Sequence, residues 1–406
     1  MIDRQEAERV AAAWARRESV RRGYECTPML VEFDLGYVVW QQQPAGVVTV
    51  PGDLTTTVID RDTGELTSWP ALPPDVVQDE YRSLHDRPRP SRTADPAAEL
   101  RRSATRAGTP ATAAHLTTTY GRFVARGAKG DQDLRHHPLV RDYLDDLPAG
   151  HLTRGGDRHA ELIVVSDALH ALDLERAEPL SQEDARAAFA GAHLEAMRVR
   201  EPGDPEGGRP ARPCESCLKA LVYFGVLEWP VLAFAEESRP PHADDVPDPG
   251  RFPPPVADAM VDAGWRPRAG ADALAAADVA QTAAVPGLTA RHQPSPAAER
   301  VLTAYRGLVT KRGGPGEAVW IRRFTIRAFR AAHTADPLAD LGRLIGTTLF
   351  PIGTENDDAI LAVDPSGRVF ALDQAGEWFI GPDIDAALTN LLLGRAASRI
   401  RDDGTW

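Results

Sequence analysis

Apolar residues follow two different periods in the N-terminal part of the chain. Residues 2–22 repeat Ala, Val and Trp at helical spacing among Glu and Arg, and this spacing predicts a helix. From residue 29 to 40 the pattern changes to the alternation and β-branching of a strand, and a second strand is predicted over 55–59. Residues 60–65 then carry the Asp and Gly of a hairpin turn. We therefore predict a small α+β module over residues 1–85.

The C-terminal part of the chain combines the same two periods. A turn is predicted at Asp364-Pro365-Ser366-Gly367, between two apolar, strand-like runs. The mixture of helical and strand-like runs predicts an α+β domain over residues 255–406. The predicted helices cover 255–264, 297–309 and 384–393, the last ending at Gly394, and the predicted strands cover 324–329, 359–363, 369–372 and 378–380.

Between these two parts, helix-like and strand-like patterns alternate. One helix is predicted to begin near residue 159 and another near residue 214, and each is followed by a strand. Alternation of this kind is typical of an α/β layout. Both helix starts coincide with the motifs that carry most of the chemistry in this sequence. The predicted order is a helix over 159–172, a strand over 193–199, a helix over 214–224 and a strand over 230–234.

Two segments rich in Pro and polar residues separate the three parts. Residues 69–95 are filled with Pro, Asp, Arg and Ser, a composition that buries too little apolar surface to fold compactly. Residues 237–255 carry a run of prolines with acidic residues between them, and Pro fixes φ and lacks an amide hydrogen. Both segments are therefore predicted to be spacers. The predicted linkers are 86–95 and 238–254, and the predicted domains are 1–85, 96–237 and 255–406.

Composition and charge limit the class of protein. A chain of 406 residues, 43% hydrophobic and 26% charged, is typical of a globular protein with two or three domains. The formal charge of −13 repels phosphate backbones, which argues against wrapping duplex nucleic acid but permits a nucleotide or a short strand. The first 22 residues lack the apolar core of a secretory signal, and no run of about 18 apolar residues predicts a membrane span. With three cysteines, two of them in a C-x-x-C pair, we expect a reducing, cytoplasmic location.

The strongest chemical signal is a pair of short motifs, His159-Ala160-Glu161 and Pro213-Cys214-Glu215-Ser216-Cys217. Zinc prefers tetrahedral nitrogen and sulfur ligands, and a catalytic zinc keeps one of its four positions for a water that it acidifies. We predict His159, Cys214 and Cys217 as the ligands of a Zn²⁺ cofactor. Glu161 would then carry protons from the water to the substrate. An H-x-E motif followed by P-C-x-x-C is the signature of zinc deaminases.

Other interpretations of the same residues remain open. The C-x-x-C pair is also compatible with a closed structural zinc site or a redox dithiol, with His159 and Glu161 incidental. Arg158 and Arg212 lie beside the motifs and are candidates to bind a substrate phosphate, together with Arg154 and Arg209. All four arginines are equally compatible with solvated loops. The histidines at 136, 137, 151 and 170 lack matching partners in the sequence, so we expect surface or packing roles for them.

Residues 96–237 resemble the YwqJ-like deaminases of bacterial polymorphic toxin systems, a branch of the cytidine-deaminase superfamily. The resemblance is carried by residues 156–161, 208–217 and 223–226. It implies a cytidine-deaminase-like αβα sandwich and a zinc-dependent deaminase that acts on a base in a nucleotide or in nucleic acid. The stretch between Glu161 and Cys214 is long and carries acidic and Pro/Gly insertions, which affects the expected shape of the pocket mouth.

The flanking parts resemble immunity modules. Residues 255–400 resemble a SUKH-3 domain, and residues 1–85 resemble the Imm35-type module. Together the three resemblances imply a multidomain α/β and α+β protein, a deaminase of a toxin–immunity or defence system. Its expected partners are a nucleobase-containing substrate and a protein bound through a flanking module. The alternative is a multidomain protein that binds another protein and whose deaminase fold serves recognition rather than turnover. The sequence leaves open the identity of the base, the oligomeric state and the effect of the flanking modules.

Overall fold

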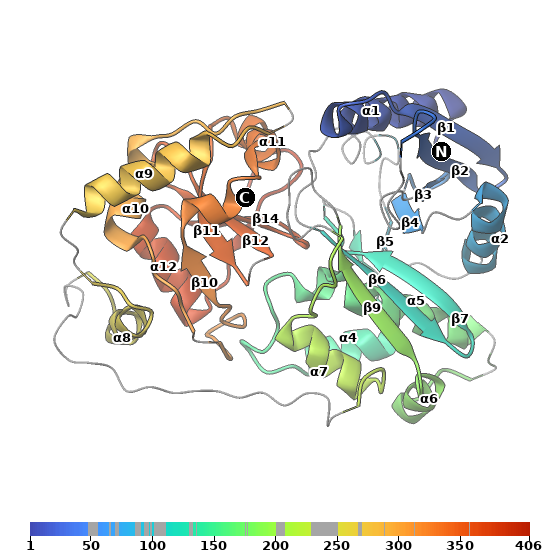
Figure 1. Ribbon diagram of the computed structural model, residues 1–406. Helices are drawn as coiled ribbons and strands as arrows, with labels where there is room; N and C mark the ends of the chain where they lie inside the picture. Colours follow the sequence, from blue (N-terminus) through green and yellow to red (C-terminus); the bar gives the residue numbers. More distant parts are fainter. Residues whose placement is uncertain are drawn as a thin grey trace.

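The computed structural model is a multidomain arrangement of helices and sheets, as predicted from the sequence (Figure 1). An N-terminal unit, a central unit and a C-terminal unit each have a sheet and an apolar core of their own. The residues that the structure describes are 1–47, 56–64, 66–69, 73–85, 91–92, 97, 100, 111–129, 133–134, 136–174, 176, 178–199, 208–228, 251–266, 270–287, 289–311, 313–356 and 358–406.

The N-terminal unit packs one long helix on an antiparallel sheet. Helix α1 (Arg4–Arg22) begins at Asp3, whose side chain accepts a hydrogen bond from the backbone N–H of Glu6, and it ends at Gly23, which has a φ of 72°. This helix was predicted. Its apolar face and the sheet bury a shared core. The sheet has the order β1 (Thr27–Phe33), β2 (Gly36–Gln42), β3 (Thr56–Asp60) and β4 (Leu66–Trp69).

Two predictions for this unit were wrong. The residues predicted as one strand over 29–40 form a hairpin, in which β1 ends at Phe33 and β2 begins at Gly36. A Cβ at position 36 would lie 2.1 Å from the carbonyl oxygen of Ile59, so the start of β2 requires glycine. The chain after residue 69 is not all spacer, because α2 (Pro74–His85) buries Val77 and Tyr81 against the sheet. Residues four positions apart lie on one face of a helix, so Val77 and Tyr81 contact the sheet together. The predicted linker at 86–95 lies mostly outside the described residues.

The central unit places a three-stranded antiparallel sheet against the helix that carries the first motif. The sheet has the order β7 (Gly121–Arg126), β6 (Thr112–Thr118) and β9 (His193–Arg198). Helix α5 (Ala160–Leu174) packs on β6 and β7 and also contacts α7 (Glu215–Tyr223). It is buried on several sides, which explains why apolar residues cover most of its circumference.

The helices at 159–172 and 214–224 and the strand at 193–199 are confirmed to within two residues. The β6–β7 hairpin and helices α4 (Pro138–Asp145) and α6 (Gln182–Ala188) were not predicted. The strand predicted over 230–234 and most of the linker predicted over 238–254 lie outside the described residues.

The C-terminal unit is a six-stranded antiparallel sheet with helices on both faces. In the central strands, Leu361 and Ala371 point into the core shared with α8, α10 and α12, whereas their neighbours Ile360 and Leu372 point into the core shared with α11. The strands are β10 (Phe324–Ile326), β11 (Phe350–Glu355), β12 (Ala359–Val363), β13 (Val369–Asp373), β14 (Gly376–Gly381) and β15 (Ser398–Arg399), and the helices are α8 (Pro254–Asp262), α9 (Ala271–Ala283), α10 (Pro296–Tyr305), α11 (Ala335–Ile345) and α12 (Ile384–Leu393).

Sequence patterns predicted most of the C-terminal sheet. Helix α12 has the predicted bounds and ends at Gly394 with a φ of 63°, and the turn at 364–367 joins β12 to β13. The strand predicted over 324–329 is shorter, because the chain turns into a 3₁₀ helix at Ala328–Ala331 after β10. Strand β11 and helices α9 and α11 were not predicted. None of the helices in the described residues is long and apolar enough to cross a membrane.

The central and C-terminal units are joined through their backbones. Gly150 N–H donates to the carbonyl of Ala318 at 3.2 Å, and Trp320 N–H donates to the carbonyl of Leu152 at 2.9 Å. Gly150 has a φ of 80°, and a Cβ there would lie 2.0 Å from the carbonyl oxygen of Gly316. The loop just before the first motif is therefore held by the C-terminal unit (Figure 1).

Candidate metal centre

The start of α5 positions the first motif. A 3₁₀ turn, Gly156–Arg158, leads into His159, which is extended with φ −74° and ψ 143°. The carbonyl of His159 accepts the first hydrogen bonds of the helix, from the backbone N–H groups of Leu162 and Ile163. His159 therefore lies before the regular helix, and Glu161 lies in its first turn. Because residues two apart on a regular helix point in opposite directions, this irregular start is what allows both side chains to approach one ligand.

The start of α7 positions the second motif. Cys214 is the N-cap of this helix, and its sulfur accepts a hydrogen bond from the backbone N–H of Cys217 at 3.5 Å. The free N–H groups and the partial positive charge at a helix N-terminus favour a thiolate over a thiol. Both cysteines are free and buried. The helix start predicted from the sequence is thus the feature that presents the two sulfurs.

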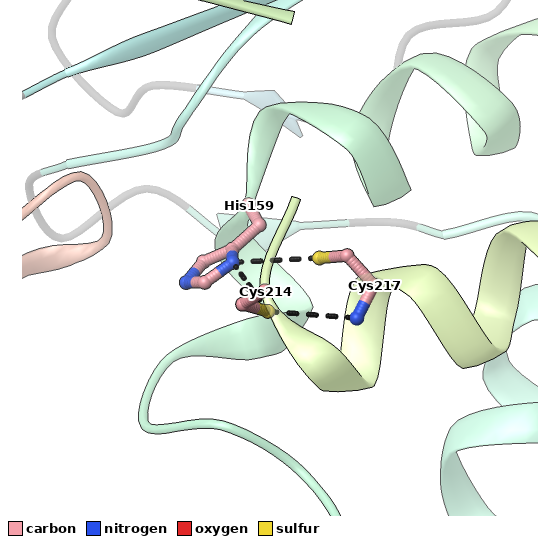
Figure 2. A group of neighbouring side chains, drawn as sticks. All are labelled: His159, Cys214 and Cys217. Atoms are coloured by element: carbon pink, nitrogen blue, oxygen red, sulfur yellow. Dashed lines mark hydrogen bonds between the residues drawn. The ribbon is translucent and has the colours of Figure 1, made fainter. Parts of the chain in front are cut away.

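The two motifs meet at one buried point between α5 and α7 (Figure 2). His159 Nδ1 lies 3.4 Å from the sulfur of Cys214 and 3.4 Å from the sulfur of Cys217. The three ligand atoms lie within 4.8 Å of one another, and the side chains are buried. The three residues predicted as metal ligands are brought together, and as a group they could bind a metal ion.

Burial and mutual charge shift the pKa values of this group. Burial lowers the pKa of His159, but the neighbouring Cys214 thiolate outweighs it and raises that pKa to about 9. Hydrogen bonding from Cys217 holds the pKa of Cys214 well below its usual range, and the same contact, with burial, raises the pKa of Cys217. The group thus pairs an anionic sulfur with a protonated imidazole, and a metal ion that binds here would displace the proton of His159.

Glu161 lies beside the three ligands with one oxygen atom unsatisfied. It is 1% exposed, burial raises its pKa to about 7, and it shares a hydrogen bond with Cys217. Its Oε2 atom and the Nε2 atom of His159 are both buried without a hydrogen-bond partner among the described residues. Buried polar atoms rarely remain unpaired unless a water, ion or substrate completes the site. The unpaired Oε2 of Glu161 is therefore available to a ligand beside the group, whereas Nε2 of His159 lies on the side of the ring away from both sulfurs (Figure 2).

A second layer of hydrogen bonds, which the sequence did not reveal, fixes the cysteine loop. Ser216 Oγ lies 3.3 Å from the sulfur of Cys214 and donates to Thr153 Oγ1 at 3.0 Å. The backbone N–H of Thr153 donates back to Ser216 Oγ at 3.2 Å. Ser216 stands inside the C-x-x-C motif, so its position gave a weak signal, but its partner is 63 positions away. This pair ties the loop before α5 to the start of α7.

The fold places the four arginines beside the motifs in different environments. Arg158 is half-buried and donates from Nε to the carbonyl of Ala128 at 2.9 Å, whereas Arg209 and Arg212 are exposed. Arg154 is buried among carboxylates of the C-terminal unit. Among the histidines, His151 packs against the ring of Trp320, as expected, but His137 is buried and its Nε2 lies 2.8 Å from Asp173 Oδ2, a partner that was not predicted.

Three family models match the chain, one after another. The Immunity protein 35-like domain matches residues 5–87, the YwqJ-like deaminase matches residues 96–226, and the SUKH-3 immunity protein matches residues 252–394. No curated protein and no solved structure matches the chain. All three residues of the buried His–Cys–Cys group lie in the second match. The chain therefore carries, in this order, an Imm35-like, a YwqJ-like deaminase and a SUKH-3 segment, as the sequence motifs indicated.

Proposed function

We propose that the central unit is a zinc-dependent deaminase that hydrolyses an exocyclic amine from a nucleobase, and that the chain serves a toxin–immunity or defence system. The observation that carries this proposal is the buried contact of His159 with Cys214 and Cys217, beside a carboxylate with an unpaired oxygen. The YwqJ-like deaminase match over the same residues supports the reaction class.

The ligand distances of the group fit a tetrahedral zinc site. In a tetrahedral zinc site with Zn–N of about 2.0 Å and Zn–S of about 2.3 Å, a nitrogen and a sulfur ligand lie about 3.5 Å apart. Both nitrogen–sulfur distances to His159 Nδ1 are 3.4 Å. Thiolate ligands also disfavour Mg²⁺ and Ca²⁺, which prefer oxygen. Among the described residues the group offers three ligands, which leaves a fourth position for water, as in catalytic rather than closed structural sites.

Glu161 is the residue that we propose to move protons. Zinc, when bound, would supply the Lewis acidity that makes water a nucleophile near neutral pH. With a pKa of about 7, Glu161 can accept one proton from the water and deliver it to the ring nitrogen, and then carry the remaining proton of the added hydroxyl group to the amine, which leaves as ammonia. The surrounding apolar core excludes bulk water, so each proton stays on the reacting groups.

We also propose which arginines contact the substrate and which segments bind a protein partner. Arg212 is exposed two residues before Cys214, where its guanidinium can bind a substrate phosphate, and Arg158 is the second candidate. We propose that a protein partner binds through the SUKH-3 segment or the N-terminal module. The thiolate ligands favour a reducing compartment, so we place the protein in the cytoplasm.

The test is an ammonia-release screen of the zinc-loaded chain against nucleosides, nucleotides and single-stranded DNA and RNA. Release that depends on Glu161 would establish the deaminase, and the preferred substrate would name the base. The alternative, a protein-binding multidomain whose deaminase fold serves recognition, predicts bound zinc with no release from any of these substrates and tight binding of a protein partner.

A further inference from the structure

A turn of the C-terminal unit packs against the loop before the first motif and against the segment after β7. A Cβ added at Gly155 would lie 2.5 Å from Ala375 Cβ, and one added at Gly127 would lie 2.6 Å from the carbonyl oxygen of Gln374. Both partners belong to the turn between β13 and β14. The loop ends themselves are joined, because the backbone N–H of Ala128 donates to the carbonyl of Arg158 at 2.9 Å. The turn therefore packs on the loop that leads into His159 and on the segment after β7 that is bonded to it.

The same unit also contacts the helix that carries the cysteines. Lys219, two residues after Cys217 on α7, lies with Nζ 4.2 Å from the ring centroid of Trp320. Trp320 also meets the ring of His151, at 6.2 Å between centroids. The C-terminal unit thus contacts both elements that supply the metal-binding group.

A buried ionic cluster joins the two units five residues before His159. The guanidinium of Arg154 donates to Glu355 at 2.6 Å and to Asp373 at 2.9 Å, and all three side chains are buried. On the C-terminal side, Arg322 Nη1 is 3.5 Å from Asp373 Oδ2 and Nη2 pairs with Asp358. Paired charges of this kind tolerate burial only while every partner is in place.

The charges of this cluster do not cancel. Three carboxylates and two guanidinium groups make up the cluster, so it carries excess negative charge next to the site.

We propose, resting on the proposed function, that the C-terminal unit closes the deaminase site in this arrangement, and that a phosphate-bearing substrate strand enters only after that unit has moved away. His159 and Glu161 are 2% and 1% exposed while the two units are docked. Arg154, five residues before His159, is bound by two carboxylates of the C-terminal unit, so it anchors that unit beside the site and is not available to a substrate phosphate. The excess negative charge would also repel an approaching strand.

The experiment uses the full chain, loaded with zinc, and reverses charges across the cluster. Arg154→Glu and Glu355→Arg each place like charges together, whereas the double variant restores an opposite pair. Glu355→Gln is a milder variant in case a reversal disturbs folding, and Glu299→Arg is a matched control on an exposed part of α10. The two readouts are the rate at which a chromophoric chelator removes zinc and the rate of ammonia release from single-stranded oligonucleotides.

Each single reversal is expected to raise both rates at least ~10-fold, the usual scale of coupling between sites, and Glu355→Gln to raise them less. Both rates of the double variant should return toward those of the wild type. Both rates of Glu299→Arg should equal those of the wild type. Folded variants whose zinc is removed no faster than from the wild type would overturn the proposal. So would faster zinc removal with slower ammonia release, because the C-terminal unit would then be part of the working site. If zinc removal follows the expected pattern but no variant releases ammonia, closure stands and the proposed deaminase activity fails.

Discussion

His159 and Cys214 are 55 positions apart in the sequence, yet His159 Nδ1 and Cys214 Sγ lie 3.4 Å apart in the structure. One residue immediately precedes helix α5 and the other caps helix α7, so the contact depends on the packing of these two helix starts. Regular helix would have turned the neighbouring Glu161 away from the same point. The predictions below test what this contact binds and what holds it together.

Zinc content tests the ligand set directly. We expect close to one zinc per chain in the purified protein, and we expect Cys214→Ala or Cys217→Ala to lose most of it, because no distant residue replaces a thiolate. Cys26→Ala is the matched control, since Cys26 is also buried and free but lies in the N-terminal unit. Elemental analysis by mass spectrometry provides the measurement. Zinc-free wild type, isolated without chelators, would instead favour the redox dithiol.

Glu161→Gln separates proton transfer from metal binding. The change preserves side-chain size and leaves the three ligands intact, so zinc should stay while turnover falls by at least ~10²-fold, the usual scale for losing a general acid or base. Glu215→Gln is a control within the second motif and should stay within a few-fold of the wild type. Steady-state ammonia release and zinc content are measured on the same samples. Unchanged turnover in Glu161→Gln would assign the proton transfer to another group.

Ser216 is expected to be a positioning residue for the metal. Ser216→Ala removes its contacts with the sulfur of Cys214 and with Thr153, and it should weaken zinc affinity by about 10- to 100-fold, as other outer hydrogen bonds to metal ligands do. Thr153→Val should have a smaller effect, because its backbone N–H still donates to Ser216. Competition titration with a zinc chelator measures both. Equal affinity in the wild type and Ser216→Ala would show that the serine only packs.

Alanine substitutions at Gly150 and Gly191 distinguish a steric clash between the two units from backbone strain alone. Both have positive φ, 80° and 76°, so alanine at either costs about 1–2 kcal/mol of backbone energy. Only at Gly150 would the new Cβ also collide with another residue, the carbonyl oxygen of Gly316 in the C-terminal unit. Gly150→Ala should therefore lower the melting temperature more than Gly191→Ala and speed zinc removal. Identical melting curves for the two variants would argue against tight docking of the two units.

Limited proteolysis tests the predicted boundaries. The Pro-rich segment at 238–254 and the polar segment at 86–95 are expected to be cut first, whereas 74–85 should resist because α2 is packed on the sheet. After cleavage in the second segment, the central and C-terminal fragments should still elute together, because Arg154 and the Gly150 loop hold them. Mass spectrometry of each chromatographic peak identifies the fragments. Separate elution would contradict the docked interface.

Local sequence signals were sufficient to single out the buried His–Cys–Cys group and many elements. His159, Cys214 and Cys217 stood out through their two short motifs, α1 followed from periodic apolar residues, and α12 followed from periodic apolar residues and the stop at Gly394. These features are encoded within a few residues, so they are visible without the fold. The two strands within 29–40 were missed because the pattern of a tight hairpin continues through its turn.

Only the tertiary structure determined what surrounds the ligands. Ser216 bonds to Thr153 and Arg154 bonds to Asp373 across separations of 63 and 219 positions, and no local pattern predicts such partners. An arginine beside a motif is compatible with solvent, phosphate or a carboxylate, and the choice depends on which surface packs against it. For Arg154 that surface is the C-terminal unit, because two buried carboxylates there compensate the cost of burying its charge.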